Sequence, residues 1–101
     1  MEANRKISHA VAVPKIWVAQ LAISERTAQK IEHKHGVTPG EVRDAVCCVK
    51  GLNAWSEDHI DHGLRWFVRV AIRGGMHLVV LYPSPYDSDV FALGSCYPSE
   101  G

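Results

Sequence analysis

Apolar and polar residues alternate most regularly in the second half of the chain, where residues 64–73 read LRWFVRVAIR. A period of two is typical of a strand with one buried face. Residues 76–82 (MHLVVLY) form a nearly continuous apolar run, as in a central strand, and residues 90–97 (VFALGSCY) predict a last strand. This half of the chain therefore predicts three consecutive strands.

The glycine pair at 74–75 separates the first two of these strands and predicts a two-residue hairpin turn. With the turn at these positions, Arg69 would lie opposite Val80 and Ala71 opposite Leu78. The face that carries the arginines would then be partly apolar.

The first part of the chain supports two interpretations. Residues 16–23 are rich in β-branched and aromatic side chains and predict a strand, and Ser24 is a natural N-cap for a helix over ERTAQKIEHKH. The alternative is one long helix, because several residues of this region also fall at helical spacing: Trp17, Leu21, Ser24, Ala28, Ile31 and His35. We favour a strand followed by a helix because of the Ser24 cap.

A second helix has the strongest local signal in the chain. Thr38 is an N-cap, Pro39 takes the first helical position, and Glu41 completes a capping box. Gly36 suits the C-terminal cap of the preceding helix, and Gly51 ends the second helix. The two helices are expected to form a hairpin with a very short link.

Residues 52–63 are polar and lack a period, so we expect a loop there. The predicted order is β-α-α-β-β-β, an α+β domain in which two helices pack on one face of an antiparallel sheet. Residues 1–15 are predicted to be a flexible lead-in and residues 16–101 a single domain.

The composition is that of an ordinary globular domain: of 101 residues, 47% are hydrophobic and 22% charged. No apolar run approaches the roughly 18 residues that a membrane helix needs, so no membrane partner is expected. A formal net charge of zero argues against nucleic-acid binding through bulk charge alone, but not against a local basic stripe. The odd set of three cysteines, with Cys47 and Cys48 adjacent, fits a reduced, cytoplasmic protein.

Alternation over residues 64–73 places three arginines on one face of the predicted strand. Arg65, Arg69 and Arg73 point the same way, with Phe67 and Ala71 between them. Arginine grips phosphate in a bidentate manner and stacks on bases, so this face is a candidate surface for RNA or a protein partner. Alternatively, the arginines only solvate the sheet and protect its edge.

The histidines are a second set of candidates. His35 ends the first predicted helix and is either a general base or a cation that suits the helix dipole. In the predicted loop, His59 and His62 stand near Asp58 and Asp61, and imidazole with carboxylate suits zinc or manganese. No recognised metal-ligand spacing is present, so no metal site is expected there.

Three stretches of the sequence together resemble a known family: WVAQLAISERTAQKIEHKHGVTPGEVRDAV, HGLRWFVRVAIRGGMHLVVLYP and DVFALGSCYP. They are similar to the BrnT-like toxins of the RelE/ParE superfamily, which are the toxin halves of bacterial type II toxin–antitoxin pairs. The most specific part is the order of a helix, the residues KHGV and a capped helix. The resemblance covers residues 16–98.

The resemblance implies a metal-independent endoribonuclease that cleaves messenger RNA, uses no cofactor and is neutralised by a cognate antitoxin. Lys34 and His35 match the KHG positions, and Arg65 matches the arginine that opens the strand after the polar loop, so these three are implied to be catalytic. The expected RNA-binding residues are Arg69, Arg73, Phe67 and Tyr97. Homo-oligomers or toxin–antitoxin hetero-oligomers are the expected assemblies.

The chain departs from the family in its last strand. Many BrnT-like chains carry an arginine there, whereas this chain has Cys96 and Tyr97, and tyrosine has no positive charge at neutral pH. Three hypotheses remain: an RNA-cleaving toxin, a non-catalytic protein-binding module of the same fold, and a metal-dependent hydrolase that uses His59 and His62.

Overall fold

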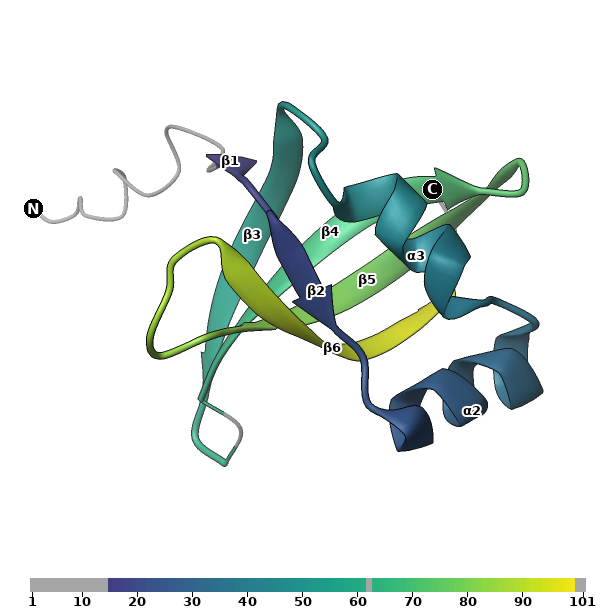
Figure 1. Cartoon of the computed structure of the whole chain (residues 1–101), viewed down its shortest axis with the longest axis horizontal. Coiled ribbons are helices and arrows are strands. Elements are labelled where there is room, and N and C mark those ends of the chain that lie inside the picture. Colours follow the sequence, from purple (N-terminus) through teal and green to yellow (C-terminus); the bar gives the residue numbers. More distant parts are fainter. Residues whose placement is uncertain (1–14, 62, 100–101) are drawn as a thin grey trace, which may run out of the picture.

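The computed structural model describes residues 15–61 and 63–99. The elements along these residues are β1 (Lys15–Ile16), β2 (Gln20–Ala22), α2 (Glu25–His35), α3 (Pro39–Val46), β3 (Leu52–His59), β4 (Gly63–Ile72), β5 (Gly75–Pro83) and β6 (Val90–Pro98). The predicted lead-in lies outside the described residues except for Lys15, which begins β1 (Figure 1).

The strands form one six-stranded sheet in the order β1-β3-β4-β5-β6-β2. β2 runs parallel to β6, and the other neighbours are antiparallel. The predicted α+β class is confirmed. The expectation of a purely antiparallel sheet is wrong, because the chain passes through both helices and three strands before β6 returns beside β2.

The sheet curls, and its topology explains why. β1 and β2 lie at opposite edges of the sheet, yet only residues 17–19 separate them in the sequence. This link spans at most about 14 Å, whereas the edges of a flat six-stranded sheet would lie about 24 Å apart. Between the two strands, Val18 forms a parallel bridge with Cys47, so one continuous segment closes the curl (Figure 1).

The N-caps predicted for both helices and the Gly36 cap of α2 are confirmed. The Ser24 side chain accepts a hydrogen bond from the Thr27 amide at 3.1 Å, and α2 begins at Glu25, so one long helix over this region is wrong. The predicted strand exists as two short pieces, β1 and β2.

Thr38 and Glu41 form the expected capping box at the start of α3. The prediction that the second helix ends at Gly51 is wrong: α3 ends at Val46, because Cys47 is already extended and bridges to Val18.

β3 is the main correction to the predicted order. Residues 52–59 form a strand paired with β4, where a loop was expected. Leu52 and Ala54 are buried, but residues 55–58 are all exposed. A strand that leaves the core on both faces has no alternation of apolar and polar residues to reveal it.

The turn between β4 and β5 is displaced by one residue from the predicted position. Its two central residues are Arg73 and Gly74, with φ of 54° and 78°, as a type I′ turn requires. Arg69 therefore pairs with Leu78, not with Val80 as expected. The register changes by two residues, so the side chains within the strands stay on their predicted faces, but Arg73 now lies in the turn.

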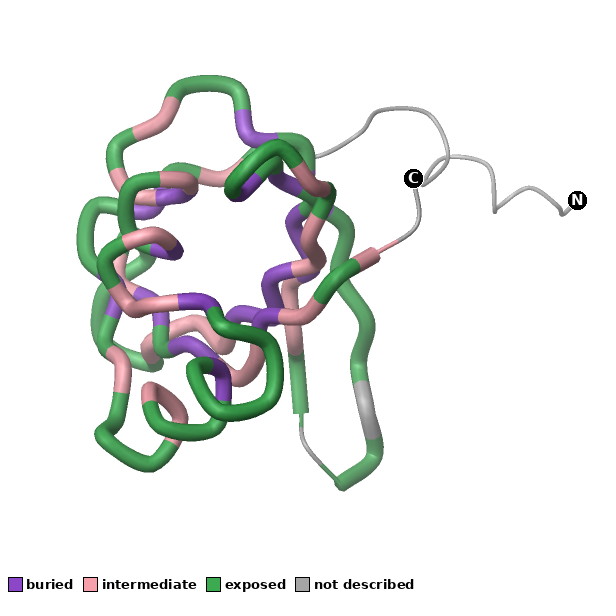
Figure 2. The backbone as a smooth tube through the Cα atoms, turned by 90° about the vertical axis from the view of Figure 1, so that its right-hand side faces the viewer, coloured by how far each residue is buried: buried purple, intermediate pink, exposed green. Residues whose placement is uncertain are grey.

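The hydrophobic core lies inside the curl. α3 packs against β4, and α2 packs along β6. The core side chains are Val18, Leu21, Ile31, Val37, Val42, Val46, Leu52, Ala54, Val68, Val70, Ile72, Val79, Leu81, Phe91, Leu93 and Cys96. Figure 2 shows the buried positions on the ring of strands and helices, while the β3–β4 hairpin extends away from it. No helix within the described part of the chain has the length and apolarity to cross a lipid bilayer.

Candidate nucleic-acid interface on the outer sheet face

The face of the sheet turned away from the core, here called the outer face, carries an aromatic pair. Trp55 of β3 and Phe67 of β4 are directly opposed in register. Their rings stack with centroids 5.6 Å apart and planes 13° from parallel. Phe67 also pairs with Val80, and both are buried outside the main core. The outer face thus has a small apolar centre of its own.

Arg65 is held tightly at one side of this centre. Its Cζ lies 5.1 Å from the centroid of the Phe67 ring, and its Nη2 donates to Glu57 Oε1 at 3.4 Å. Its Nε is buried and finds no acceptor among the described residues. A buried donor without an acceptor costs about 1–3 kcal/mol. Arg65 is therefore positioned by packing and by its carboxylate partner, with little of its guanidinium open to a ligand.

Arg69 is the more available arginine. It is exposed, and its Cζ lies 5.5 Å from the centroid of the Trp55 ring. A guanidinium over an indole keeps its N–H edge directed outward, so it can still bind a phosphate. Arg69 pairs with Leu78 of β5, and Leu78 pairs with Tyr97 of β6.

Tyr97 links this row to the end of α2. The ring centroids of Tyr97 and His35 lie 6.5 Å apart, with the planes tilted by 49°. Residues opposed in register share a sheet face. The outer row, running from the end of α2 across the sheet, therefore consists of His35, Tyr97, Leu78, Arg69 and Trp55.

The predicted catalytic residues do not all meet. Lys34 is exposed next to His35 at the end of α2. Arg65 lies four residues before Arg69, about 13 Å away along an extended strand. Arg65 and His35 are thus too far apart to contact the same phosphate in this arrangement, whereas Arg69 lies only two strand spacings, about 10 Å, from Tyr97.

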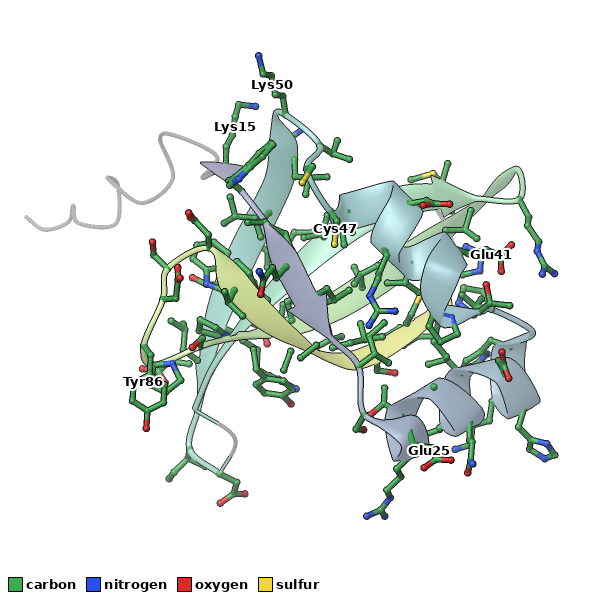
Figure 3. The ribbon with its side chains drawn as sticks, viewed as in Figure 1. Lys15, Glu25, Glu41, Cys47, Lys50 and Tyr86 are labelled. Atoms are coloured by element: carbon green, nitrogen blue, oxygen red, sulfur yellow. The ribbon has the colours of Figure 1, made fainter. Side chains whose placement is uncertain are left out.

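Arg73 does not extend the arginine face. It is the first central residue of the β4–β5 turn, and its Nε donates to Glu41 Oε2. Glu41 belongs to α3 (labelled in Figure 3). The Glu41 carboxylate also accepts a hydrogen bond from the Thr38 amide. Both hydrogen bonds lower the pKa of Glu41, and the one from Thr38 has the larger effect. The arginine stabilises the start of α3.

The metal hypothesis gains no support from the residues that the structure shows. Asp58 and the backbone of His59 belong to β3, and His62 lies outside the described residues. Among the described residues, no group of three His, Cys, Asp or Glu side chains could hold a metal ion.

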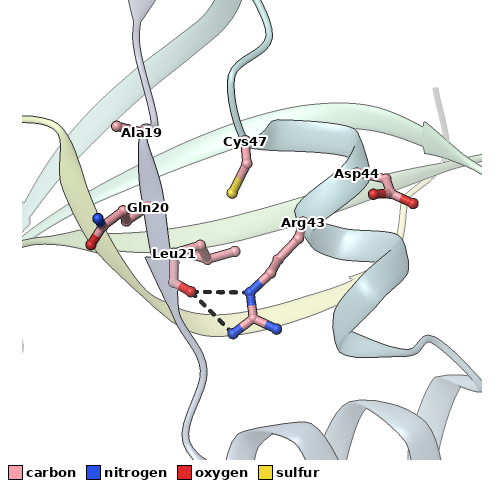
Figure 4. Close-up of a pocket in the computed structure, with 6 residues that line it drawn as sticks. All are labelled: Ala19, Gln20, Leu21, Arg43, Asp44 and Cys47. Atoms are coloured by element: carbon pink, nitrogen blue, oxygen red, sulfur yellow. Dashed lines mark hydrogen bonds between the residues drawn. The ribbon is translucent and has the colours of Figure 1, made fainter.

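Cys47 and Cys96 are not built as nucleophiles. Burial raises the pKa of the Cys96 thiol to about 11 and also raises the pKa of Cys47. Both thiols stay protonated at neutral pH, and only a thiolate attacks efficiently. Cys47 lines a hollow of about 540 Å³ where Arg43 Nε and Nη2 donate to the Leu21 carbonyl oxygen at 3.3 and 3.2 Å (Figure 4). Arg43 thus provides hydrogen bonds to a backbone carbonyl group of the edge strand β2.

Two contributors to the outer face were missed from the sequence. Trp55 and Glu57 fell in a predicted loop, although Leu52 and Ala54 before them alternate as a strand would. Comparison of the chain with protein-family models, with curated proteins and with solved structures found no match.

Proposed function

We propose that this protein binds and cleaves RNA as the toxin component of a bacterial type II toxin–antitoxin pair, as its resemblance to BrnT-like toxins implies. The observation that supports the proposal best is the outer row. An exposed arginine over an indole stands on the same face as a tyrosine in contact with a histidine. Aromatic rings bind bases by stacking, and a guanidinium binds phosphate.

The roles follow from the order of the outer row. Trp55 stacks with a base, and Arg69 beside it binds a neighbouring phosphate of the RNA. At the other end of the row, Tyr97 orients the scissile phosphate, whose developing charge is stabilised by nearby positive charge. His35 takes the proton from the 2′-hydroxyl. The 2′-oxygen then forms a bond to phosphorus, the 5′-oxygen leaves with a proton from solvent, and a 2′,3′-cyclic phosphate remains. Lys34 adds positive charge at the same end.

The test is cleavage of a single-stranded RNA oligonucleotide by purified protein with a chelator present. We expect His35→Gln to lower the cleavage rate by about 100-fold or more, because a general base contributes roughly that much. Arg69→Ala should weaken RNA binding as well as cleavage. Arg26→Ala, an exposed arginine at the other end of α2, is the matched control and should be unchanged. Full cleavage by both site variants would refute these roles.

A second candidate is a non-catalytic module that binds a protein through the outer face. The engagement of Arg65 by Glu57 and Phe67 favours it, because that guanidinium is occupied within the fold. The neutral net charge also favours it. Three results together would support the protein-binding module: no RNA cleavage by the purified protein, no growth arrest on induced expression, and loss of a bound protein partner in the Trp55→Ala variant.

A further inference from the structure

The β3–β4 hairpin extends beyond the rest of the sheet, and one of its edges is open. β1 pairs only with Leu52 and Asn53, and β5 begins to pair with β4 only at Trp66. Over residues 54–59, β3 has no neighbour on its outer edge among the residues that the structure describes. Figure 2 shows this hairpin projecting from the ring, exposed along most of its length.

An open strand edge is a binding site for another strand. Every second residue of an edge strand directs its N–H and C=O groups outward, so residues 54–59 offer about three such residues. A two-stranded ribbon in water is only marginally stable, and a third strand would stabilise it. Peptide recognition by strand addition uses these groups for affinity and the alternating side chains for specificity.

The side chains along this edge define the complementary strand. Trp55 and Glu57 point to the outer face, and Asp58 points to the opposite face. Trp55 is 38% exposed and Asp58 is exposed, so both can be contacted. A fitting strand has an apolar residue opposite Trp55 and basic residues opposite Glu57 and Asp58. Because the added strand would run antiparallel to β3, its sequence from the N- to the C-terminus would be basic, basic, any residue, apolar.

Three other occupants fit less well. A second copy of β3 would bring acidic side chains to an acidic edge, and like charges opposed across strands are unfavourable. If the β1 register (Lys15 opposite Asn53) were continued, the chain itself would supply an apolar residue, Val13, opposite Trp55. It would bring no basic residue to the two carboxylates, because Val11 would lie opposite Glu57 and Ala10 opposite Asp58. RNA would be repelled by the two carboxylates.

We propose that residues 54–59 of β3 receive an extended basic segment of a partner protein as an added antiparallel strand. The antiparallel direction follows β1, which pairs in that sense with the same edge. Glu57 and Asp58 then have two effects: they prevent self-association of the edge, and they select a partner of opposite charge. This site shares the Trp55 side chain with the RNA surface proposed above, but neither the strand pairing nor its test depends on RNA binding.

The test uses the full-length protein labelled with ¹⁵N and a synthetic peptide with the core Thr-Lys-Lys-Thr-Val-Thr at millimolar concentration. Its two lysines would lie opposite Asp58 and Glu57, and its valine opposite Trp55. We expect amide shifts and slower hydrogen exchange at residues 54–59. The matched control peptide, with glutamates in place of the lysines, should bind at least about tenfold more weakly.

A charge reversal in the protein completes the test. Glu57→Lys with Asp58→Lys should weaken the lysine peptide about tenfold or more and strengthen the glutamate peptide. Because Glu57 pairs with Arg65, Asp58→Lys alone, which leaves that pair intact, provides a second variant with a smaller shift in the same direction. Equal binding of both peptides, or shifts confined to other strands, would overturn the proposal. So would binding that requires removal of residues 1–14, or concentration-dependent dimers formed through β3.

Discussion

Gly94 provides a sharp test of the packing of the outer face. It occupies the bulge in β6, where Leu81 pairs with Leu93 but Val80 pairs with Ser95. A Cβ at Gly94 would lie 2.4 Å from Cε2 of Tyr82 and 3.1 Å from its Cδ2. Side-chain carbons do not approach so closely, so the ring or the strand must move when alanine is introduced.

We expect Gly94→Ala to lower the free energy of unfolding by about 1–3 kcal/mol, the usual cost of forcing an extra methyl into a packed site. In urea this would move the midpoint down by about 1–3 M, because a domain of this size has a slope near 1 kcal/mol/M. The clash is with one ring, so Tyr82→Leu should remove most of the additional cost of the alanine. A double-mutant cycle measures this coupling directly.

The matched control is Gly40→Ala in the first turn of α3. The nearest contact of a Cβ there is Thr38 Oγ1 at 4.0 Å, so there is space for the methyl group. Alanine in a helix with ordinary backbone angles should leave stability unchanged or raise it by about 0.4–1 kcal/mol. If Gly94→Ala also proves neutral, or if Tyr82→Leu does not relieve its cost, the ring is not held against the bulge and the reasoning is refuted.

Three further predictions concern the caps and the thiols. Thr38→Ala should lower the free energy of unfolding by about 1 kcal/mol in thermal or urea melts, because it removes one half of the capping box. The pKa of Glu41 is lowered in the folded protein, so its contribution to stability is present above the pKa of the unfolded state and is lost as the pH falls through the lowered value; Glu41→Gln should flatten that part of the acid titration of stability. Cys48 is exposed and should react with a thiol reagent at pH 8 in the native state, whereas Cys96, buried with a pKa of about 11, should react only on unfolding. Rapid labelling of all three thiols in the native protein would contradict the packing of β6.

The elements that the sequence predicted well are those specified by local chemistry. The Ser24 and Thr38 caps depend on residues within three positions of each other, so they can be recognised without tertiary information. β4 was equally visible because one of its faces is buried along most of its length. β3 was missed because its second half leaves the core, so burial no longer imposes alternation there.

The candidate site was predictable only where it depended on one strand. The alternation correctly put Phe67 and Arg69 on one face, but it extended this face to Arg73, where the strand has already ended in a turn. The contact between His35 and Tyr97 depends on how α2 packs along β6. No spacing within either segment encodes that packing, so only the folded structure shows it.

The closure of the curl by the β1–β2 segment bears on how the protein folds during its synthesis. Leu21 pairs with Phe91, a partner that the ribosome adds 70 residues later. β2 emerges early and must therefore remain unpaired along that edge until β6 has been made. Pairing between such distant residues is slow, because the ends of a long loop must meet before any contact forms. Folding should thus finish only after release of the C-terminal strand, and chains stalled before residue 90 would retain an open β2 edge prone to aggregation.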